Sequence, residues 1–308
     1  MRVALTEVAS RDGLQNEAHP VSTEQKIELI DRVARAGIRR FEVTSFVSPR
    51  AVPALSDAED VVRGVRDRDR LVLEALVPNL RGAERAAPLG LDAWVCFVSA
   101  SETHSLANSN APTYEAIERL RPVIGLADQL GIEAIGSIAT AFGCPFEGDV
   151  PIGRVVDVAH RQADLGFRTI KLGDTIGSAH PSQVTRMLAA LNQALPQVEF
   201  VLHLHDTRGM SLANVLAGLA AGGTAFESSL GGVGGCPFAP GATGNVSTED
   251  LVHFLHLEGH ETGADLAALI EAGRWLETVL GRPLPARLLH SSPVGTLVDP
   301  TTMKRAVG

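Results

Sequence analysis

The sequence predicts a (β/α)8 TIM barrel, an α/β fold, with additional C-terminal helices packed on the barrel. Short apolar, β-rich runs alternate with longer helical patterns, and this alternation occurs eight times along the chain. The candidate strands are residues 3–8, 40–46, 71–77, 92–98, 132–139, 168–173, 199–205 and 224–229. A doubly wound open sheet is the alternative, but such sheets usually have fewer strands, and no G-x-G-x-x-G motif opens the first helix.

Helical patterns fill the intervals between these strands. Residues 22–36 begin with Ser22, a plausible N-cap, and Gly37 follows their end. The same pattern is found in residues 112–130, 151–165, 181–194 and 211–222. The last part of the chain has helical patterns and no ninth strand. We therefore expect a single catalytic domain: residues 1–308, with the barrel at about 1–246 and a helical extension at about 247–308.

Composition limits the class of protein. The chain has 308 residues, of which 45% are hydrophobic and 20% charged, as expected for a globular protein with a sizeable core. The net charge of −9 argues against nucleic acid as the main partner, because phosphate binding needs a dense basic surface. No apolar run reaches the roughly 18 residues of a membrane span. No signal peptide is visible at the N-terminus, and three widely spaced cysteines imply no disulfide framework, so we expect a cytoplasmic protein.

The stretch VLHLHDTRG, residues 201–209, contains two histidines one residue apart. Side chains at i and i+2 of a strand point to the same face, so His203 and His205 would enter the barrel together. A lone strand histidine is more often a satisfied core residue, but two on one face, with carboxylates at the ends of neighbouring strands, favour a metal site. Asp206 would face the other way from His205 and therefore stay outside the ligand set.

Two imidazoles with oxygen ligands and no cysteine suit Mg²⁺ or Mn²⁺ better than a tetrahedral structural zinc. Asp12 would supply a carboxylate and Asn245 a carbonyl oxygen, since both follow strand ends on the expected catalytic face. Each also has a plain structural interpretation as a turn residue, in SRDG and after Gly244 respectively. The open positions would then accept water or a bidentate substrate.

Three further residues could carry chemistry. Arg11 would place a fixed positive charge beside the metal, where it could stabilise a carbonyl oxygen that gains negative charge. Glu42 lies in an apolar strand and needs a buried partner, for which Arg11 is the obvious choice. Cys236 lies in a glycine-rich loop and is a candidate acid or nucleophile. Cys144, in another loop, is a weaker candidate, and Cys96, in an apolar strand, is expected to be inert.

A series of motifs in the same order along nearly the whole chain closely resembles the hydroxymethylglutaryl-CoA lyase family. These motifs are TEVASRDGLQNE, FEVTSFVSPRAVP, VPNLRGAERA, SASETHS, GCPFEG, KLGDTIG, HLHDTRGMSLANVL and GGVGGCPFAPGATGNVSTEDLVHFLH. The glycine–cysteine loop is the most specific of them. The sister synthases for isopropylmalate and homocitrate share the arginine–aspartate and His-x-His elements but differ in this loop.

The resemblance implies a divalent-metal-dependent retro-Claisen cleavage of 3-hydroxy-3-methylglutaryl-CoA to acetoacetate and acetyl-CoA, with Mg²⁺ or Mn²⁺ as cofactor and a homodimer as the working form. The pathways it implies are leucine degradation and ketone body metabolism. By position, the residues it implies are the metal ligands Asp12, His203, His205 and Asn245; the catalytic residues Arg11, Glu42, Asp174 and Cys236; and the substrate-binding residues Gln15, Asn108, Asn110 and Thr175.

Some positions depart from the family pattern. Ala107 stands where a lysine is expected, while Phe238 and Arg208 stand where tyrosine is common. These changes concern contacts to CoA and the acyl chain rather than the chemistry, so another branched 3-hydroxyacyl-CoA remains an alternative substrate. The other rivals are an acetyl-CoA/2-oxo acid condensing synthase and a silent barrel that only binds acyl-CoA or a metal.

Overall fold

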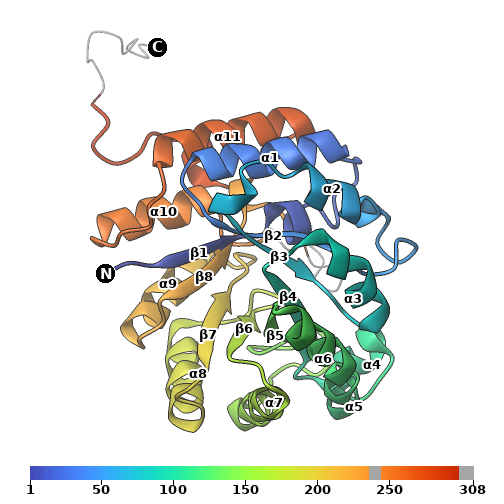
Figure 1. The fold of residues 1–308 in the computed structure, drawn as a ribbon. Coiled ribbons are helices and arrows are strands. Elements are labelled where there is room, and N and C mark those ends of the chain that lie inside the picture. The colour runs from blue at the N-terminus through green and yellow to red at the C-terminus, as the bar shows by residue number, and fades with distance from the viewer. Residues whose placement is uncertain (236–243, 298–308) are drawn as a thin grey trace.

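The computed structural model describes residues 1–235 and 244–297, and its strands form a closed parallel barrel (Figure 1). The strands follow one another around the barrel in chain order: β1 Ala4–Glu7, β2 Arg40–Ser45, β3 Val72–Leu76, β4 Ala93–Ser99, β5 Glu133–Ala139, β6 Thr169–Gly173, β7 Glu199–His203 and β8 Ala225–Ser228. The parallel pairing of β8 with β1 closes the ring. The predicted eight-stranded barrel is therefore confirmed, with each strand end within two residues of its expected position.

Helices surround the barrel on its outside (Figure 1). They are α1 Thr23–Arg35, α2 Ala58–Gly64, α3 Leu80–Ala86, α4 Glu102–Ser109, α5 Thr113–Glu118, α6 Arg121–Leu130, α7 Ile152–Leu165, α8 Pro181–Ala194, α9 Ser211–Ala220, α10 Thr248–Leu257 and α11 Leu266–Leu280. The short helices α2, α3 and α4 were not among the stretches that the sequence singled out. None of the described helices is both long and apolar enough to cross a membrane.

Helix α1 begins and ends as its sequence predicts. The Ser22 hydroxyl accepts a hydrogen bond from the Gln25 amide at 3.3 Å, and the Gln25 side chain accepts one from the Ser22 amide at 2.9 Å. This reciprocal capping box satisfies two amides at the start of the helix. Gly37 follows the helix with φ of +103°, and a Cβ there would lie 2.2 Å from the Gly263 carbonyl oxygen, so only glycine fits.

The prediction of a single helix over residues 112–130 is wrong in one respect, because the structure has two helices there, α5 and α6. Pro122 lies in the first turn of α6 and has no amide hydrogen to donate. Its ring also excludes the carbonyl four residues earlier, so a continuous helix through this position is disfavoured and a new helix begins instead.

The C-terminal helices pack on the barrel beside the first helix. Helix α11 contacts both α1 and α10 (Figure 1). The Arg32 guanidinium of α1 lies 4.7 Å from the ring centroid of Trp275 on α11, and the Asp265 amide at the start of α11 donates to the Ala36 carbonyl at 2.7 Å. These contacts hold the segment that follows the glycine-rich loop against the start of the chain.

We predict that Ser22→Ala lowers the free energy of unfolding by about 1 kcal/mol, because the substitution leaves the first turn of α1 without its side-chain cap. Urea denaturation of the two proteins measures this difference. Ser22→Asp is the matched control and should keep most of the stability, since aspartate also caps helices. An unchanged stability of Ser22→Ala would contradict the prediction.

Candidate metal centre

Arg11 and Asp12 lie in a tight turn directly after β1. The segment Ala9–Gly13 forms one turn of π-helix, in which the Gly13 amide donates to the Val8 carbonyl. Such turns are rare and often occur at functional sites. The turn presents both side chains at the carboxyl end of the barrel strands, which is where active sites of this fold are built.

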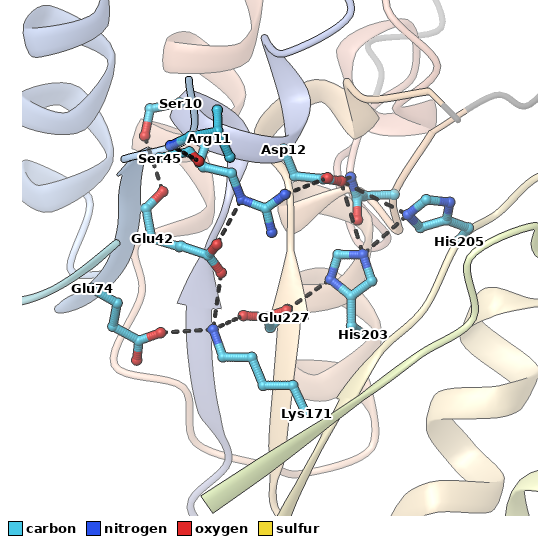
Figure 2. Close-up of polar contacts among 12 residues, drawn as sticks. Ser10, Arg11, Asp12, Glu42, Ser45, Glu74, Lys171, His203, His205 and Glu227 are labelled. Carbon is cyan, nitrogen blue, oxygen red and sulfur yellow. Dashed lines mark hydrogen bonds and ion pairs between the residues drawn. The ribbon is translucent and has the colours of Figure 1, made fainter. Parts of the chain in front are cut away.

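His203 ends β7 and His205 follows it by two residues, and both side chains point into the same space, as strand alternation predicts (Figure 2). The Nε2 atoms of His203 and His205 lie 3.0 Å apart. From these atoms to Asp12 Oδ2 the distances are 3.9 Å for His203 and 3.8 Å for His205. One ligand atom from each of the three residues thus lies within 4.8 Å of the others.

Asn245 reaches this group from the segment after the glycine-rich loop. Its backbone pairs with that of His205, and its Nδ2 donates to Asp12 Oδ2 at 2.7 Å. Its Oδ1 is buried and has no hydrogen-bond partner among the described residues. Gly234, with φ of +124°, allows this approach, because a Cβ there would lie 2.5 Å from Asn245 Nδ2.

These residues fit a divalent cation. A carboxylate oxygen and two imidazole nitrogens converge, and the Asn245 amide lies against this carboxylate with its buried oxygen still unpartnered among the described residues. Two imidazole nitrogens facing each other at 3.0 Å are suited to share a positive centre, and nitrogen and oxygen donors together suit a divalent metal ion. Asp206, as expected, lies outside the group: its Oδ1 accepts the Ser211 amide at 3.0 Å.

Charge at the site keeps Asp12 ionised. Burial alone would raise the pKa of Asp12, but the Arg11 guanidinium, followed by the two histidines, outweighs it and holds that pKa well below its ordinary value. Arg11 Nη1 lies 2.8 Å from Asp12 Oδ1, and Arg11 Nε lies 2.6 Å from Glu42 Oε1. The partnership expected between Arg11 and Glu42 is therefore present.

A buried network extends from this site through the barrel interior (Figure 2). The Lys171 ammonium pairs with three carboxylates, and one of them, Glu227, also contacts His203 Nδ1 at 2.7 Å. Burial tends to lower the pKa of His203, but the hydrogen bond to Glu227 outweighs it, so this pKa is raised. Of Lys171 and its three carboxylate partners, only Glu42 was predicted from the sequence to have a buried partner. The pattern that could have found the others is a charged residue inside an apolar strand, as in Val72–Leu76 (Glu74), Thr169–Gly173 (Lys171) and Ala225–Ser228 (Glu227).

Asp174 and Thr175 lie at the end of β6, next to the histidine strand. The Asp174 amide donates to the His203 carbonyl at 2.9 Å, and Asp174 Oδ1 accepts the amides of Ser178 and Ala179. Its Oδ2 is buried with no hydrogen-bond partner among the described residues, and burial raises the pKa of this carboxyl group. Thr175 Oγ1 accepts the Thr140 amide at 2.7 Å, so its hydroxyl supports the end of β5.

The remaining predicted residues are less closely tied to the metal centre. Gln15 is half-buried just after the Arg11–Asp12 turn. Asn108 is exposed on α4, and Asn110 is exposed at its end, with φ of +49°, a conformation that asparagine tolerates. Cys236 and Phe238 lie outside the described residues. The substrate roles of Gln15, Asn108 and Asn110 stay predictions.

Two buried glutamates hold the described start of the glycine-rich loop. Glu7 Oε1 accepts the Leu230 amide at 2.9 Å, and both carboxylate oxygens of Glu249 accept the Gly231 amide, at 3.0 and 2.9 Å. Burial raises the pKa of Glu7 to about 7 and that of Glu249 to about 8. The residues that precede Cys236 are thus anchored to β1 and α10.

Comparisons with a family model, with related sequences and with solved structures all indicate the same family. The family model described as HMGL-like matches residues 2–276. The chain is 43% identical to the hydroxymethylglutaryl-CoA lyase of Bacillus subtilis, over 94% of this chain and 97% of that one. It is 41% identical to a Pseudomonas aeruginosa lyase named for 3-hydroxy-3-isohexenylglutaryl-CoA and hydroxymethylglutaryl-CoA, over 91% and 94%. A solved HMG-CoA lyase from Acinetobacter baumannii, in complex with coenzyme A and 3-methylmalate, matches with a TM-score of 0.92 at 38% identity, over 97% of each chain.

We predict that the protein binds one Mn²⁺ per chain and that Asn245→Ala weakens this binding at least about ten-fold, because the variant removes the amide oxygen that we expect to bind the metal. Electron paramagnetic resonance of free Mn²⁺ during a titration measures the affinity. Asn192→Ala, an exposed asparagine of α8, is the matched control and should bind as the wild type does. Equal affinities of wild type and Asn245→Ala would remove Asn245 from the ligand set.

Glu249 should give the fold a characteristic pH dependence. Its folded pKa of about 8 lies above the ordinary 4.5, so the folded state holds an extra proton between these values. The stability that this group contributes is therefore full below pH 4.5 and falls as pH rises towards 8. Glu249→Gln abolishes this titration, so the melting temperature of the variant relative to wild type should increase with pH across this window.

Thermal melts at a series of pH values check this expectation, with Glu258→Gln, an exposed glutamate at the end of α10, as control. The control should follow the wild type at every pH. Parallel curves for wild type and Glu249→Gln would show that the Glu249 carboxyl group does not titrate in this range.

Proposed function

The chain belongs to the HMGL-like family, and from this membership we propose that it is a divalent-metal-dependent carbon–carbon lyase that cleaves 3-hydroxy-3-methylglutaryl-CoA to acetoacetate and acetyl-CoA. The observation that carries the proposal is the convergence of Arg11 with Asp12, His203, His205 and Asn245 at one end of the barrel. The Arg11 guanidinium, a fixed positive charge, therefore lies beside residues that can bind a metal ion. The cleavage needs both features.

The reaction breaks the bond between C2 and C3 of the acyl chain. The C3 hydroxyl loses its proton, C3 becomes the ketone carbon of acetoacetate, and the bonding electrons move into the thioester group to form the enolate of acetyl-CoA. A proton delivered to C2 then completes acetyl-CoA. A divalent ion bound by the four ligand residues would supply Lewis acidity that favours loss of the hydroxyl proton.

Arg11 is proposed to stabilise the enolate oxygen. Its guanidinium is held by Glu42 through Nε and by Asp12 through Nη1, and burial tends to lower its pKa but these carboxylates raise it, so it remains charged. Glu42 and Asp12 contact the other two nitrogens of the Arg11 guanidinium and not Nη2. Nη2 can therefore donate a hydrogen bond to a substrate oxygen. A preoriented donor is worth most where charge develops in the transition state.

Cys236 is proposed to deliver the proton to C2, on the resemblance of its loop to the lyase family. The support from the described residues is indirect: Glu7 and Glu249 fix Leu230 and Gly231, and Asn16 Nδ2 donates to the Gly235 carbonyl at 2.7 Å. These contacts bring the chain up to the edge of the metal centre just before Cys236.

The finer properties are proposals on the same basis. We propose Mg²⁺ or Mn²⁺ as the cofactor, a homodimer as the working form, and a place in leucine degradation and ketone body metabolism in the cytoplasm. The nitrogen and oxygen donor set supports the choice of metal. The dimer and the pathway rest on resemblance, and the compartment rests on the cysteine usage.

A longer branched acyl chain is the second candidate substrate, because the Pseudomonas aeruginosa relative is named for 3-hydroxy-3-isohexenylglutaryl-CoA as well. One departure from the family pattern has a structural explanation here. Arg208 Nη1 donates to the carbonyls of Ile176 and Gly177, at 2.6 and 2.9 Å, so it fastens the loop after β6. Its effect on the acyl chain is therefore expected to be indirect.

We predict that the purified protein releases acetoacetate from 3-hydroxy-3-methylglutaryl-CoA when Mg²⁺ or Mn²⁺ is present and that EDTA abolishes turnover. Arg11→Met should lower kcat by about 10²–10³-fold, the effect of losing one oxyanion donor. Arg186→Met, an exposed arginine of α8, is the matched control. Rapid cleavage of the isohexenyl thioester beside negligible acetoacetate would favour the second substrate, and activity unaffected by EDTA would overturn the metal requirement.

A further inference from the structure

Lys171 lies at the centre of the barrel and is enclosed by three carboxylates (Figure 2). Its Nζ lies 3.0 Å from Glu42 Oε2 and 2.7 Å from Glu74 Oε2, and it also pairs with Glu227 Oε1. The side chains of all four residues are at most 3% exposed. Strand β6 lies opposite β2 in the closed ring, so the ion pair between Lys171 and Glu42 crosses the barrel interior.

This ammonium has no remaining capacity for the substrate. A lysine ammonium has three hydrogen-bond donors, and here each is directed at a different carboxylate. Lys171 therefore acts through its partners rather than on the reacting atoms.

Two of these partners touch the metal centre. The second oxygen of Glu42 holds Arg11 Nε at 2.6 Å, and the second oxygen of Glu227 holds His203 Nδ1 at 2.7 Å. The Lys171 ammonium is thus connected through Glu42 to Arg11 and through Glu227 to His203. Arg11 and His203 face each other across the site (Figure 2).

We infer that Lys171 is a positioning residue for the lyase reaction: it fixes Glu42 and Glu227, and through them orients Arg11 and sets the tautomer of His203. The inference rests on the proposed function. With Nδ1 donating to Glu227, the lone pair of His203 Nε2 points towards Asp12 and His205, as a metal ligand must. Without the ammonium, three neighbouring carboxylates would repel one another, and neither Glu42 nor Glu227 would keep its orientation.

Glu74 offers a matched control. It contacts Lys171 and Arg40 and neither Arg11 nor His203, so it belongs to the charge balance but not to the positioning contacts. Arg11 and Arg40 border the buried carboxylates and also pair with Asp12 and Glu133. Lys171→Met removes one positive charge from this network, and the double variant Lys171→Met/Glu74→Gln restores the net charge without restoring the anchor.

The test compares wild type, Lys171→Met, Glu74→Gln and the double variant, each in the folded state as checked by circular dichroism. Mn²⁺ affinity is measured by electron paramagnetic resonance, the His203 tautomer by ¹⁵N NMR of histidine-labelled protein, and kcat with 3-hydroxy-3-methylglutaryl-CoA. We expect the Mn²⁺ dissociation constant of Lys171→Met and of the double variant to rise about 10–100-fold, the usual effect of losing the support of a metal ligand. The NMR signal of protonated Nδ1 should weaken, kcat should fall in both variants, and Glu74→Gln should stay within about three-fold of wild type.

A double variant with wild-type Mn²⁺ affinity, tautomer and turnover would overturn the inference, because Lys171 would then serve charge balance alone. An equal loss in Glu74→Gln would overturn it as well, since that residue contacts neither Arg11 nor His203. The double variant keeps the test decisive if Lys171→Met alone does not fold. Affinity and tautomer need no substrate, so a protein that binds Mn²⁺ as expected but makes no acetoacetate would refute the proposed function and not this inference.

Discussion

The ion pairs around the Lys171 ammonium are the constraint on which the rest of this site depends. Charged groups buried in a barrel interior are destabilising unless each is paired and hydrogen-bonded. Here every carboxylate has one oxygen on Lys171 and the other on a further donor, namely Arg11, Arg40 or His203. Burial by itself would lower the pKa of Lys171, but the carboxylates outweigh it and raise that pKa, so the ammonium stays charged.

The barrel brings the residues of the metal centre together at the carboxyl end of its strands. Parallel strands finish at one edge, and there the π-helical turn after β1 meets the histidine pair at the end of β7 and Asn245. Asp12 Oδ2 lies 2.7 Å from Asn245 Nδ2 and 3.9 and 3.8 Å from the Nε2 atoms of His203 and His205. Glycine makes the last approach possible, because Gly234 leaves no room for a side chain beside the Asn245 amide. Two buried glutamates, Glu7 and Glu249, hold the start of the glycine-rich loop by accepting the amides of Leu230 and Gly231. This start is thus fixed to the same framework that holds Arg11 and Asp12.

Features with a local rule could be predicted from the sequence. The alternation of side chains along a strand predicted that His203 and His205 lie together and that Asp206 lies outside the ligand set. The alternation of strands and helices predicted the barrel. Glu42 was recognised because a carboxylate in an apolar strand requires a partner. Pro122 carried a local indication of a helix start that the hydrophobic pattern of residues 112–130 concealed.

The network around Lys171 could not be predicted in the same way. Its members come from β2, β3, β6 and β8, and only closure of the barrel with its particular register brings them together. The roles of Asn108 and Asn110 depend on contacts with a substrate rather than on contacts within the chain, and Cys236 lies outside the described residues. Family resemblance is therefore the support for these three.

The most direct test of this account is an anomalous difference map from crystals of the protein grown with Mn²⁺. We expect a peak at coordination distance from Asp12, His203, His205 and Asn245, next to Arg11, with the Lys171 ammonium still enclosed by its carboxylates. A map without that peak, or with Mn²⁺ bound only among Glu42, Glu74 and Glu227, would contradict it.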